Sequence, residues 1–150
     1  MGKPMSSQEE RLWSVFAHLS HLVNFILPFI PFVNVIAPLA LWLWRKNDSD
    51  FFNDQGKEAL NFQITVSIVI FILQLLTFLT TGSFGLNMFR NDDVYFYNYN
   101  YAYGFYGFMS VWVVLLSIVK LLNLILTIIA AVQAHNGVRY RYPLNLRLVK

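Results

Sequence analysis

The residues of this chain with the clearest capacity for chemistry are polar side chains set within long apolar stretches. Polar groups are costly inside a membrane, so they face protein or water there and mark candidate functional sites. Along residues 59–81 they recur at helical spacing and form one stripe down a helix, and along 108–134 they gather near a lysine. The candidate functional polar face comprises Gln63, Ser67, Gln74, Thr77, Lys120 and Asn123.

Two interpretations of this polar face remain open. We expect the Lys120 side of the last helix to meet the Gln74 and Thr77 side of its neighbour, which would line a groove that conducts ions or a substrate. Alternatively, Lys120 extends its aliphatic stem toward the membrane surface, and the amides hold helices together by hydrogen bonds. A water-accessible face favours conduction, whereas a dry face favours helix packing.

A second set of polar residues lies near the N-terminus, where Ser14, His18, His21 and Asn24 follow helical spacing. Two histidines three residues apart can bind a metal or relay protons. No carboxylate lies inside the apolar runs to complete a metal site or a triad, and His135 is the only other histidine. Hydrogen bonding between helices is therefore the favoured role. With no phosphate loop, dinucleotide fingerprint or zincin motif, we predict no enzyme, no catalytic residue, no metal and no cofactor.

Composition places the chain among membrane proteins. Of its 150 residues, 57% are hydrophobic and 13% are charged, whereas soluble domains carry about 25% charged residues. The absence of cysteine excludes disulfides and thiolate chemistry. A net charge of +3 is small for a nucleic-acid binder, so we expect the lipid bilayer, and no nucleic acid, as partner. The length suits one membrane domain over residues 1–150.

The apolar stretches predict an all-α integral membrane protein, a small bundle of three to four transmembrane helices. Pro28 and Pro31 break the first segment. Each half of that segment is too short to cross a hydrocarbon core of about 30 Å, so it forms either one bent span or a shallow hairpin. The predicted divisions are the broken first segment at 12–27 and 32–44, spans at 59–81 and 108–134, an aromatic outer loop at 82–107 and a basic tail at 135–150.

Basic residues orient these segments. Residues 45–58 and the tail are rich in Lys and Arg, whereas the loop 82–107 holds only Arg90. Because basic loops stay in the cytoplasm, we predict a cytoplasmic C-terminus and an outer loop outside. A hairpin, which we favour, puts the N-terminus inside, and a bent span puts it outside. The tyrosine-rich run at 94–108 forms either an aromatic belt at the headgroups or a surface that binds a partner.

The segment "NDQGKEALNFQ" joins a charged loop to the second apolar stretch. Asn53 or Asp54 can cap a helix there, with Glu58 near the positive end of its dipole. We hypothesise that Glu58 or Asp54 pairs with Arg139 or Arg141, which would tie this span to the tail. The alternative is a charged interfacial junction without a specific pair.

Two further patterns are present. One lies among the polar residues in the first turns of that span, and the other among the apolar residues of the tail. Glu58, Asn61 and Thr65 lie on the face opposite the long stripe, at the cytoplasmic end only. The tail alternates leucines with polar residues from Leu144 to Leu148 and is basic. It is therefore suited to lie on a membrane and attract anionic lipids.

Four separated motifs resemble one widespread bacterial family of small membrane proteins of unknown function, the domain of unknown function forty-eight seventy. They are "HLSHL" (18–22), "IPFVNVIAPLALWLWRK" (30–46), "FNDQGKEALNFQITV" (52–66) and "AAVQAHNGVRYRYPLNLRLVK" (130–150). That family is often labelled as similar to the Tic-type import component of the chloroplast inner envelope. The resemblance implies a helical bundle in a bacterial inner membrane and implies no activity.

The family pattern falls on specific residues of this chain. Its Pro-Asn-Pro element falls on Pro31, Asn34 and Pro38, its junction on Gln55, Gly56, Lys57, Glu58, Ala59, Asn61, Phe62 and Gln63, and its tail on Ala134, Asn136, Gly137, Tyr142, Pro143 and Leu144. Arg141 belongs to the same tail motif. We expect a translocation- or transport-related, import-component-like protein in a homo-oligomer or a larger membrane complex. The alternative is a structural or lipid-interacting adaptor with no transport activity.

Overall fold

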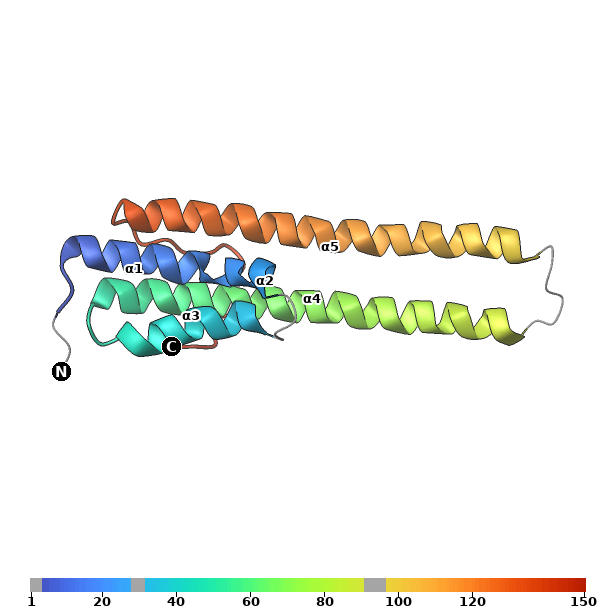
Figure 1. Cartoon of the computed structure of the whole chain (residues 1–150), viewed down its shortest axis with the longest axis horizontal. Helices are drawn as coiled ribbons and strands as arrows, with labels where there is room; N and C mark the ends of the chain where they lie inside the picture. Colours follow the sequence, from blue (N-terminus) through green and yellow to red (C-terminus); the bar gives the residue numbers. More distant parts are fainter. Residues whose placement is uncertain (1–3, 28–31, 91–96) are drawn as a thin grey trace. The chain divides into compact units, whose positions relative to one another are not determined.

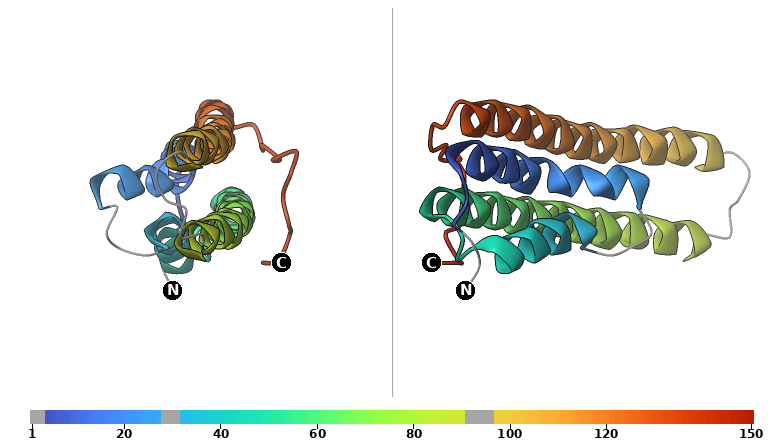
Figure 2. Two further views of the ribbon diagram at one scale, coloured as in Figure 1. Left: turned by 90° about the vertical axis from the view of Figure 1, so that its right-hand side faces the viewer. Right: turned by 60° about the vertical axis from the view of Figure 1, so that its left-hand side comes forward.

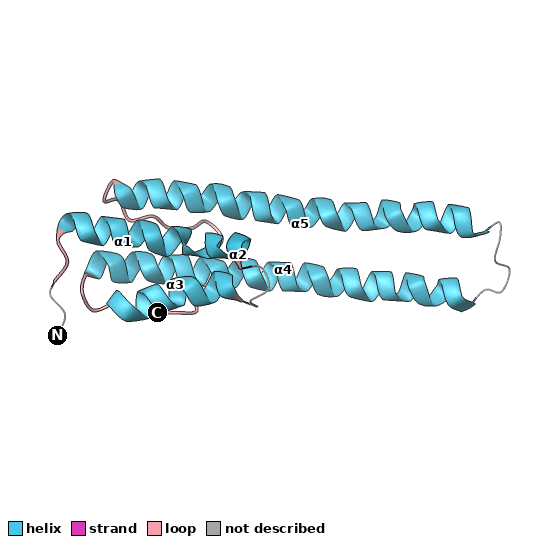
Figure 3. Ribbon diagram, in the orientation of Figure 1, coloured by secondary structure: helices cyan, strands magenta, loops and turns pink. Residues whose placement is uncertain are grey.

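The computed structural model describes residues 4–27, 32–90 and 97–150, and all regular structure within those ranges is helical (Figure 3). The elements are α1 (Ser7–Leu19), the short 3-10 helix η1 (Ser20–Leu22), α2 (Val23–Ile26), α3 (Val33–Arg45), α4 (Asp50–Arg90) and α5 (Tyr97–His135) (Figure 1). The chain divides into two compact units. Unit 1 comprises Met1–Ser67 and Leu122–Lys150, and unit 2 comprises Ile68–Leu121. The all-helical prediction is confirmed over the described residues.

α1 begins with a capping box. The Ser6 hydroxyl accepts from the Glu9 amide at 3.3 Å, and the Glu9 carboxylate accepts from the Ser6 amide at 2.8 Å. These bonds satisfy amides at the helix start that have no partner within the helix. α1 and η1 together bury His18 and His21.

α3 packs back against α1, η1 and α2, so these four elements form a helical hairpin. The N-cap of α3 is Phe32, whose φ of 58° lies in the left-handed region. Pro38 lies inside α3 and is buried. Pro28 and Pro31, the predicted break, lie outside the described residues.

α3 also holds the first turns of α4. A Cβ added at Gly56 would lie 2.8 Å from Trp42 Cδ1, so only glycine permits this approach. Trp42 Nε1 donates to Asn53 Oδ1 at 2.8 Å, and Asn34 Nδ2 donates to Ser67 Oγ at 2.7 Å. Lys57, beside Gly56, is half-buried.

α4 starts earlier than its sequence indicated. The helix begins at Asp50, and Ser49 Oγ accepts from the Phe52 amide at 3.2 Å. The predicted caps at Asn53 and Asp54 are therefore wrong. Both residues lie inside the helix and direct their side chains to tertiary partners.

α4 and α5 are the long apolar helices, and each runs through both units. Asp50–Gly82 and Tyr106–His135 are long and apolar enough to cross a membrane, and little of the most apolar 18-residue window of each is buried. Within unit 2 the exposed side chains include Phe71, Phe78 and Val113, as a lipid-facing helix requires. Helical structure continues into much of the predicted outer loop, 82–107, and residues 91–96 lie outside the described ranges.

The core of unit 1 lies where α1 and the ends of α4 and α5 meet. Figure 2 shows these helices and α3 gathered around one another, with the tail passing along one side. Ala130, Ala131 and Ala134 of α5 are buried, and small residues let helix backbones approach closely. Phe52 of α4 is fully buried beside Ala17 of α1.

Candidate functional site

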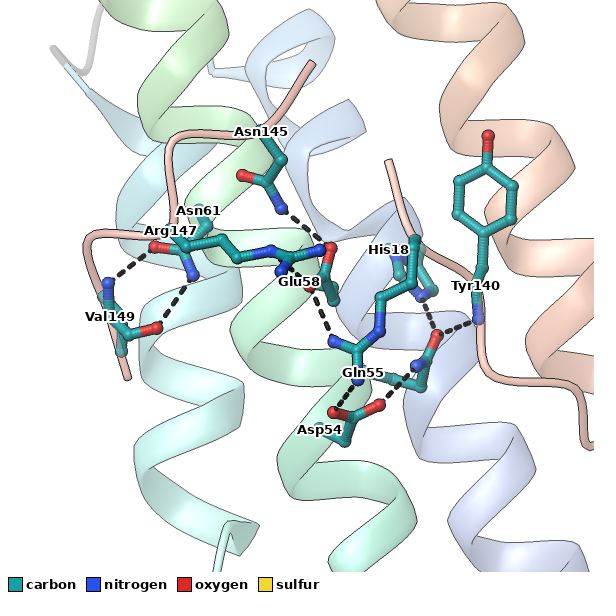
Figure 4. A network of polar contacts seen from close by, with 10 residues as sticks. His18, Asp54, Gln55, Glu58, Asn61, Tyr140, Asn145, Arg147 and Val149 are labelled. Carbon is teal, nitrogen blue, oxygen red and sulfur yellow. Dashed lines mark hydrogen bonds and ion pairs between the residues drawn. The ribbon is translucent and has the colours of Figure 1, made fainter. Parts of the chain in front are cut away.

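The last thirteen residues, 138–150, contain no helix and lie along the first half of α4 (Figure 4). Extended backbone groups need hydrogen-bond partners, and here side chains of α4 supply several of them. We call the α4 residues that bind this tail the tail clamp; they are Asp54, Gln55, Glu58, Asn61 and Thr65.

Three clamp residues bind the tail backbone. Asn61 accepts from the Val149 amide at 2.8 Å and donates to the Val149 carbonyl at 2.9 Å. Thr65 Oγ1 accepts from the Leu146 amide at 3.0 Å. Gln55 Oε1 likewise accepts a backbone amide, from Tyr140, at 3.1 Å. These bonds do not depend on the tail's side chains, so they fix the path of the tail backbone along α4 rather than a sequence.

The two acidic clamp residues bind tail side chains. Arg141 donates to Glu58 at 2.7 Å and to Asp54 at 2.6 Å, and Asn145 donates to Glu58 at 2.8 Å. The Glu58 side chain is 4% exposed, so its charge needs these partners. The hydrogen bond to Glu58, reinforced by Asp54 and opposed by partial burial, raises the pKa of Arg141. The predicted pairing of Glu58 and Asp54 is confirmed for Arg141.

A chain of hydrogen bonds fixes the tautomer of His18. The Asp54 carboxylate accepts from Gln55 Nε2 at 3.0 Å, so Gln55 Oε1 faces His18 Nε2 at 3.3 Å. Because that oxygen only accepts, His18 carries its proton on Nε2. His18 Nδ1 is then an acceptor for the Tyr142 hydroxyl at 3.1 Å.

His18 and Tyr142 anchor the tail in the interior. His18 lies in α1, outside the two candidate spans, and is 1% exposed. Burial lowers its pKa to about 4, so the imidazole is neutral at physiological pH. The Tyr142 ring stacks on Phe62 at 3.8 Å between centroids, and burial raises the pKa of its hydroxyl. Tyr142 therefore joins the tail to α1 through His18 and to α4 through Phe62.

The predicted polar face is divided between the two units. In unit 1, Gln63 Nε2 donates to Asn123 Oδ1 at 3.1 Å, and Ser67 accepts from Asn34. Gln63 and Thr127 are buried. These residues therefore join helices by hydrogen bonds, while Gln63 Oε1 has no hydrogen-bond partner among the described residues.

In unit 2 the expected groove stays a prediction. Thr77 Oγ1 donates to the Leu73 carbonyl of its own helix at 2.7 Å. Gln74 and Lys120 are both exposed, and no hydrogen bond or ion pair joins either one to the described part of the chain. The predicted contact between the Lys120 side and the Gln74 side therefore stays a prediction.

The turn after α5 directs the tail toward the clamp. Gly137 has φ of 77°, and its amide donates to the Ala134 carbonyl at 3.0 Å, which closes the helix. A Cβ there would lie 2.8 Å from the Arg11 guanidinium. Asn136 precedes this turn and is exposed, as is Pro143 beyond it.

Sequence reasoning missed the importance of the short stripe on α4. Asp54, Glu58, Asn61 and Thr65 fall within about 60° of one another at 100° per residue, and this stripe holds the tail. The signal was present, because Glu58, Asn61 and Thr65 share a face. No sequence pattern showed that backbone groups of Leu146 and Val149 would cover it.

The clamp can hold an extended chain, and its residues form no metal centre. Among the residues that the structure describes, no group of three or more His, Cys, Asp or Glu side chains could hold a metal ion. The acids of the clamp are instead occupied by Arg141 and Asn145.

The regular structure of the described residues is all helical, with two helices long and apolar enough to cross a membrane and a basic tail bound to α4, as in a small helical membrane protein. A family model matches residues 9–149, and the chain belongs to the MamF/MmsF family, described as the magnetosome magnetite crystal formation protein family. The match supports the resemblance to a bacterial membrane family but not the unknown-function family or the import-component label. No curated protein and no solved structure matches the chain.

Proposed function

We propose that this chain is a non-enzymatic, structural membrane component of magnetite crystal formation. The family match supports the process. The single observation that carries the structural role is the tail clamp, in which conspicuous polar groups of unit 1 bind the chain's own tail. Groups used in this way stabilise one arrangement of helices and are not presented to a substrate.

The same reasoning disfavours a translocation role for the predicted polar face. A conducting path needs polar groups that face water in series. Here Gln63 is paired with Asn123, Ser67 with Asn34, and Thr77 with its own helix. We therefore assign these side chains to helix packing.

We further propose a topology with two crossings of a bacterial inner membrane, by α4 and α5. α1 and α3 have 13 residues each, a length of about 20 Å, which is too short to cross. The hairpin of α1 to α3 then stays on the cytoplasmic side with both termini. The basic character of residues 45–58 and of the tail supports this orientation.

The test is complementation in a magnetite-forming bacterium that lacks this protein. We expect its loss to change crystal size or shape in electron micrographs while total cell iron stays unchanged. Arg141→Glu should reproduce the defect, because it places an acid against Glu58 and Asp54. The matched control is Arg139→Glu, the same charge change at an exposed residue two positions away, which should complement fully.

A fall in iron uptake that precedes any crystal defect would instead support transport. Full complementation by Arg141→Glu, with normal protein level, would remove the clamp from the functional account. Both results can be obtained from the same strains, because crystals and cell iron are measured separately.

A further inference from the structure

The tail has two different faces. Leu144, Leu146 and Leu148 are 75%, 49% and 61% exposed, whereas the intervening Asn145 and the following Val149 are half-buried against α4. The backbone here is not a regular strand: it bends at Pro143 and Leu144, and the Leu148 amide donates to the Leu146 carbonyl at 2.8 Å. The clamp therefore holds polar and backbone groups inward and leaves a row of leucines facing away from unit 1.

The position of the tail along α4 determines how deep in the membrane this leucine row lies. The tail is bonded to Glu58, Asn61 and Thr65, and the long apolar stretch of α4 starts at Ala59. The start of an apolar stretch marks the boundary between headgroups and hydrocarbon. The tail thus runs along the helix at the depth of the membrane interface.

The tail's charges match one kind of surface. Arg147 and Lys150 are exposed, and residues 136–150 contain no acid. Among the basic residues of the tail, Arg141 forms the shortest ion pairs with the acids of the clamp. Basic residues beside exposed apolar side chains suit an interface rich in anionic lipid.

We propose that Leu144, Leu146 and Leu148 form a lipid-contact surface that inserts into the cytoplasmic interface of an anionic phospholipid bilayer. The clamp sets which residues face lipid, and the exposed basic residues select anionic headgroups. This proposal rests on the topology given under the proposed function. It adds a lipid-binding role for the tail to the tail's role in packing.

The chain has no cysteine, so single cysteines report on single positions. The full chain is placed in vesicles of phosphatidylcholine with or without phosphatidylglycerol. It carries an environment-sensitive fluorophore at Leu146→Cys, Leu148→Cys or Val149→Cys. Val149 is the matched control, because it adjoins Leu148 and binds Asn61 through its backbone alone.

Nitroxide lipids labelled near the headgroup should quench the two leucine positions about twofold more strongly than position 149. Aqueous iodide should quench the leucine positions weakly, and phosphatidylglycerol should strengthen the lipid quenching. Asn61→Leu in the same labelled chains should reduce the difference between positions 148 and 149, while circular dichroism shows the helices intact.

Strong iodide quenching at the leucine positions would place them in water and overturn the proposal. Exclusion of both quenchers would also overturn it, since a second protein surface would then cover the row. Equal lipid quenching at 146, 148 and 149 would reject the clamp as the source of the pattern. None of these readouts depends on magnetite, so failure here leaves the crystal-formation test to be judged separately.

Discussion

At the scale of single residues, the molecule depends on a few buried polar groups that satisfy one another. Glu58 is the central one, because Arg141 and Asn145 both donate to it. A buried charge whose partner is removed keeps its cost of desolvation without the compensating bond. The stability lost when a residue is replaced therefore depends more on how deeply its partner is buried than on how exposed the residue itself is.

Replacing Arg141 tests this dependence. Arg141→Ala leaves Glu58 buried without its main cation, and we expect a loss of about 2 kcal/mol in the free energy of unfolding, reduced from the fully buried case because Arg141 is half exposed. Arg139→Ala removes the same side chain from an exposed position and should change stability by less than about 0.5 kcal/mol. Denaturant unfolding in detergent micelles measures both, and equal losses would contradict the pairing.

His18 makes stability depend on pH. Its pKa is lowered to about 4 by burial, from 6.5, so the unfolded chain takes up a proton before the folded chain does. Stability should therefore fall by about 1.4 kcal/mol per pH unit as pH drops from 6.5 toward 4. Nearby, Glu58 opposes and His21 reinforces this lowering.

His18→Gln removes the titrating group while retaining a polar side chain. Thermal unfolding between pH 7 and pH 5 stays above the usual range of carboxylate titration, so the dependence in that interval reports histidine. The slope should flatten in the variant. An unchanged slope would assign the effect to another group.

At the scale of elements, the turn at Gly137 determines where the tail goes. Gly137→Ala must hold a left-handed φ and push Cβ against Arg11, so we expect a destabilisation of about 1 kcal/mol or more. Gly107→Ala is the matched control, since it lies inside α5 with open space around its Cβ position, and alanine there favours the helix. The melting temperatures of both variants test this prediction. An unchanged melting temperature for Gly137→Ala would show that the turn does not require a glycine.

Sequence could predict the helices far better than their contacts. Apolar runs long enough to cross a membrane led directly to the existence of α4 and α5, because hydrophobicity is a local property. Their ends were missed, since a helix continues beyond the apolar run where nothing stops it. The N-cap of α4 was misplaced because Asn53 is used by Trp42 and Asp54 by Arg141, and such tertiary partners leave no local trace.

The same limit explains the polar face. Helical periodicity shows which residues share a side of α4, but not what covers that side. The long stripe attracted a functional interpretation, yet the short stripe of Glu58, Asn61 and Thr65 binds the tail. A partner more than eighty residues away, joined through backbone groups, is outside the reach of a periodicity argument.

At the scale of the whole molecule, the side of the membrane on which the N-terminus lies shows whether the first elements cross the membrane. The α1–α3 hairpin and the two long helices together predict both termini in the cytoplasm, whereas a crossing by the first segment would put Ser6 outside. Ser6→Cys in the otherwise cysteine-free chain should resist a membrane-impermeant maleimide in intact cells and react after lysis. Asn91→Cys, in the predicted outer loop, should react in intact cells and so shows that the reagent reaches the membrane. Labelling of Ser6→Cys in intact cells would reject the hairpin topology, and the cytoplasmic placement of the N-terminus with it.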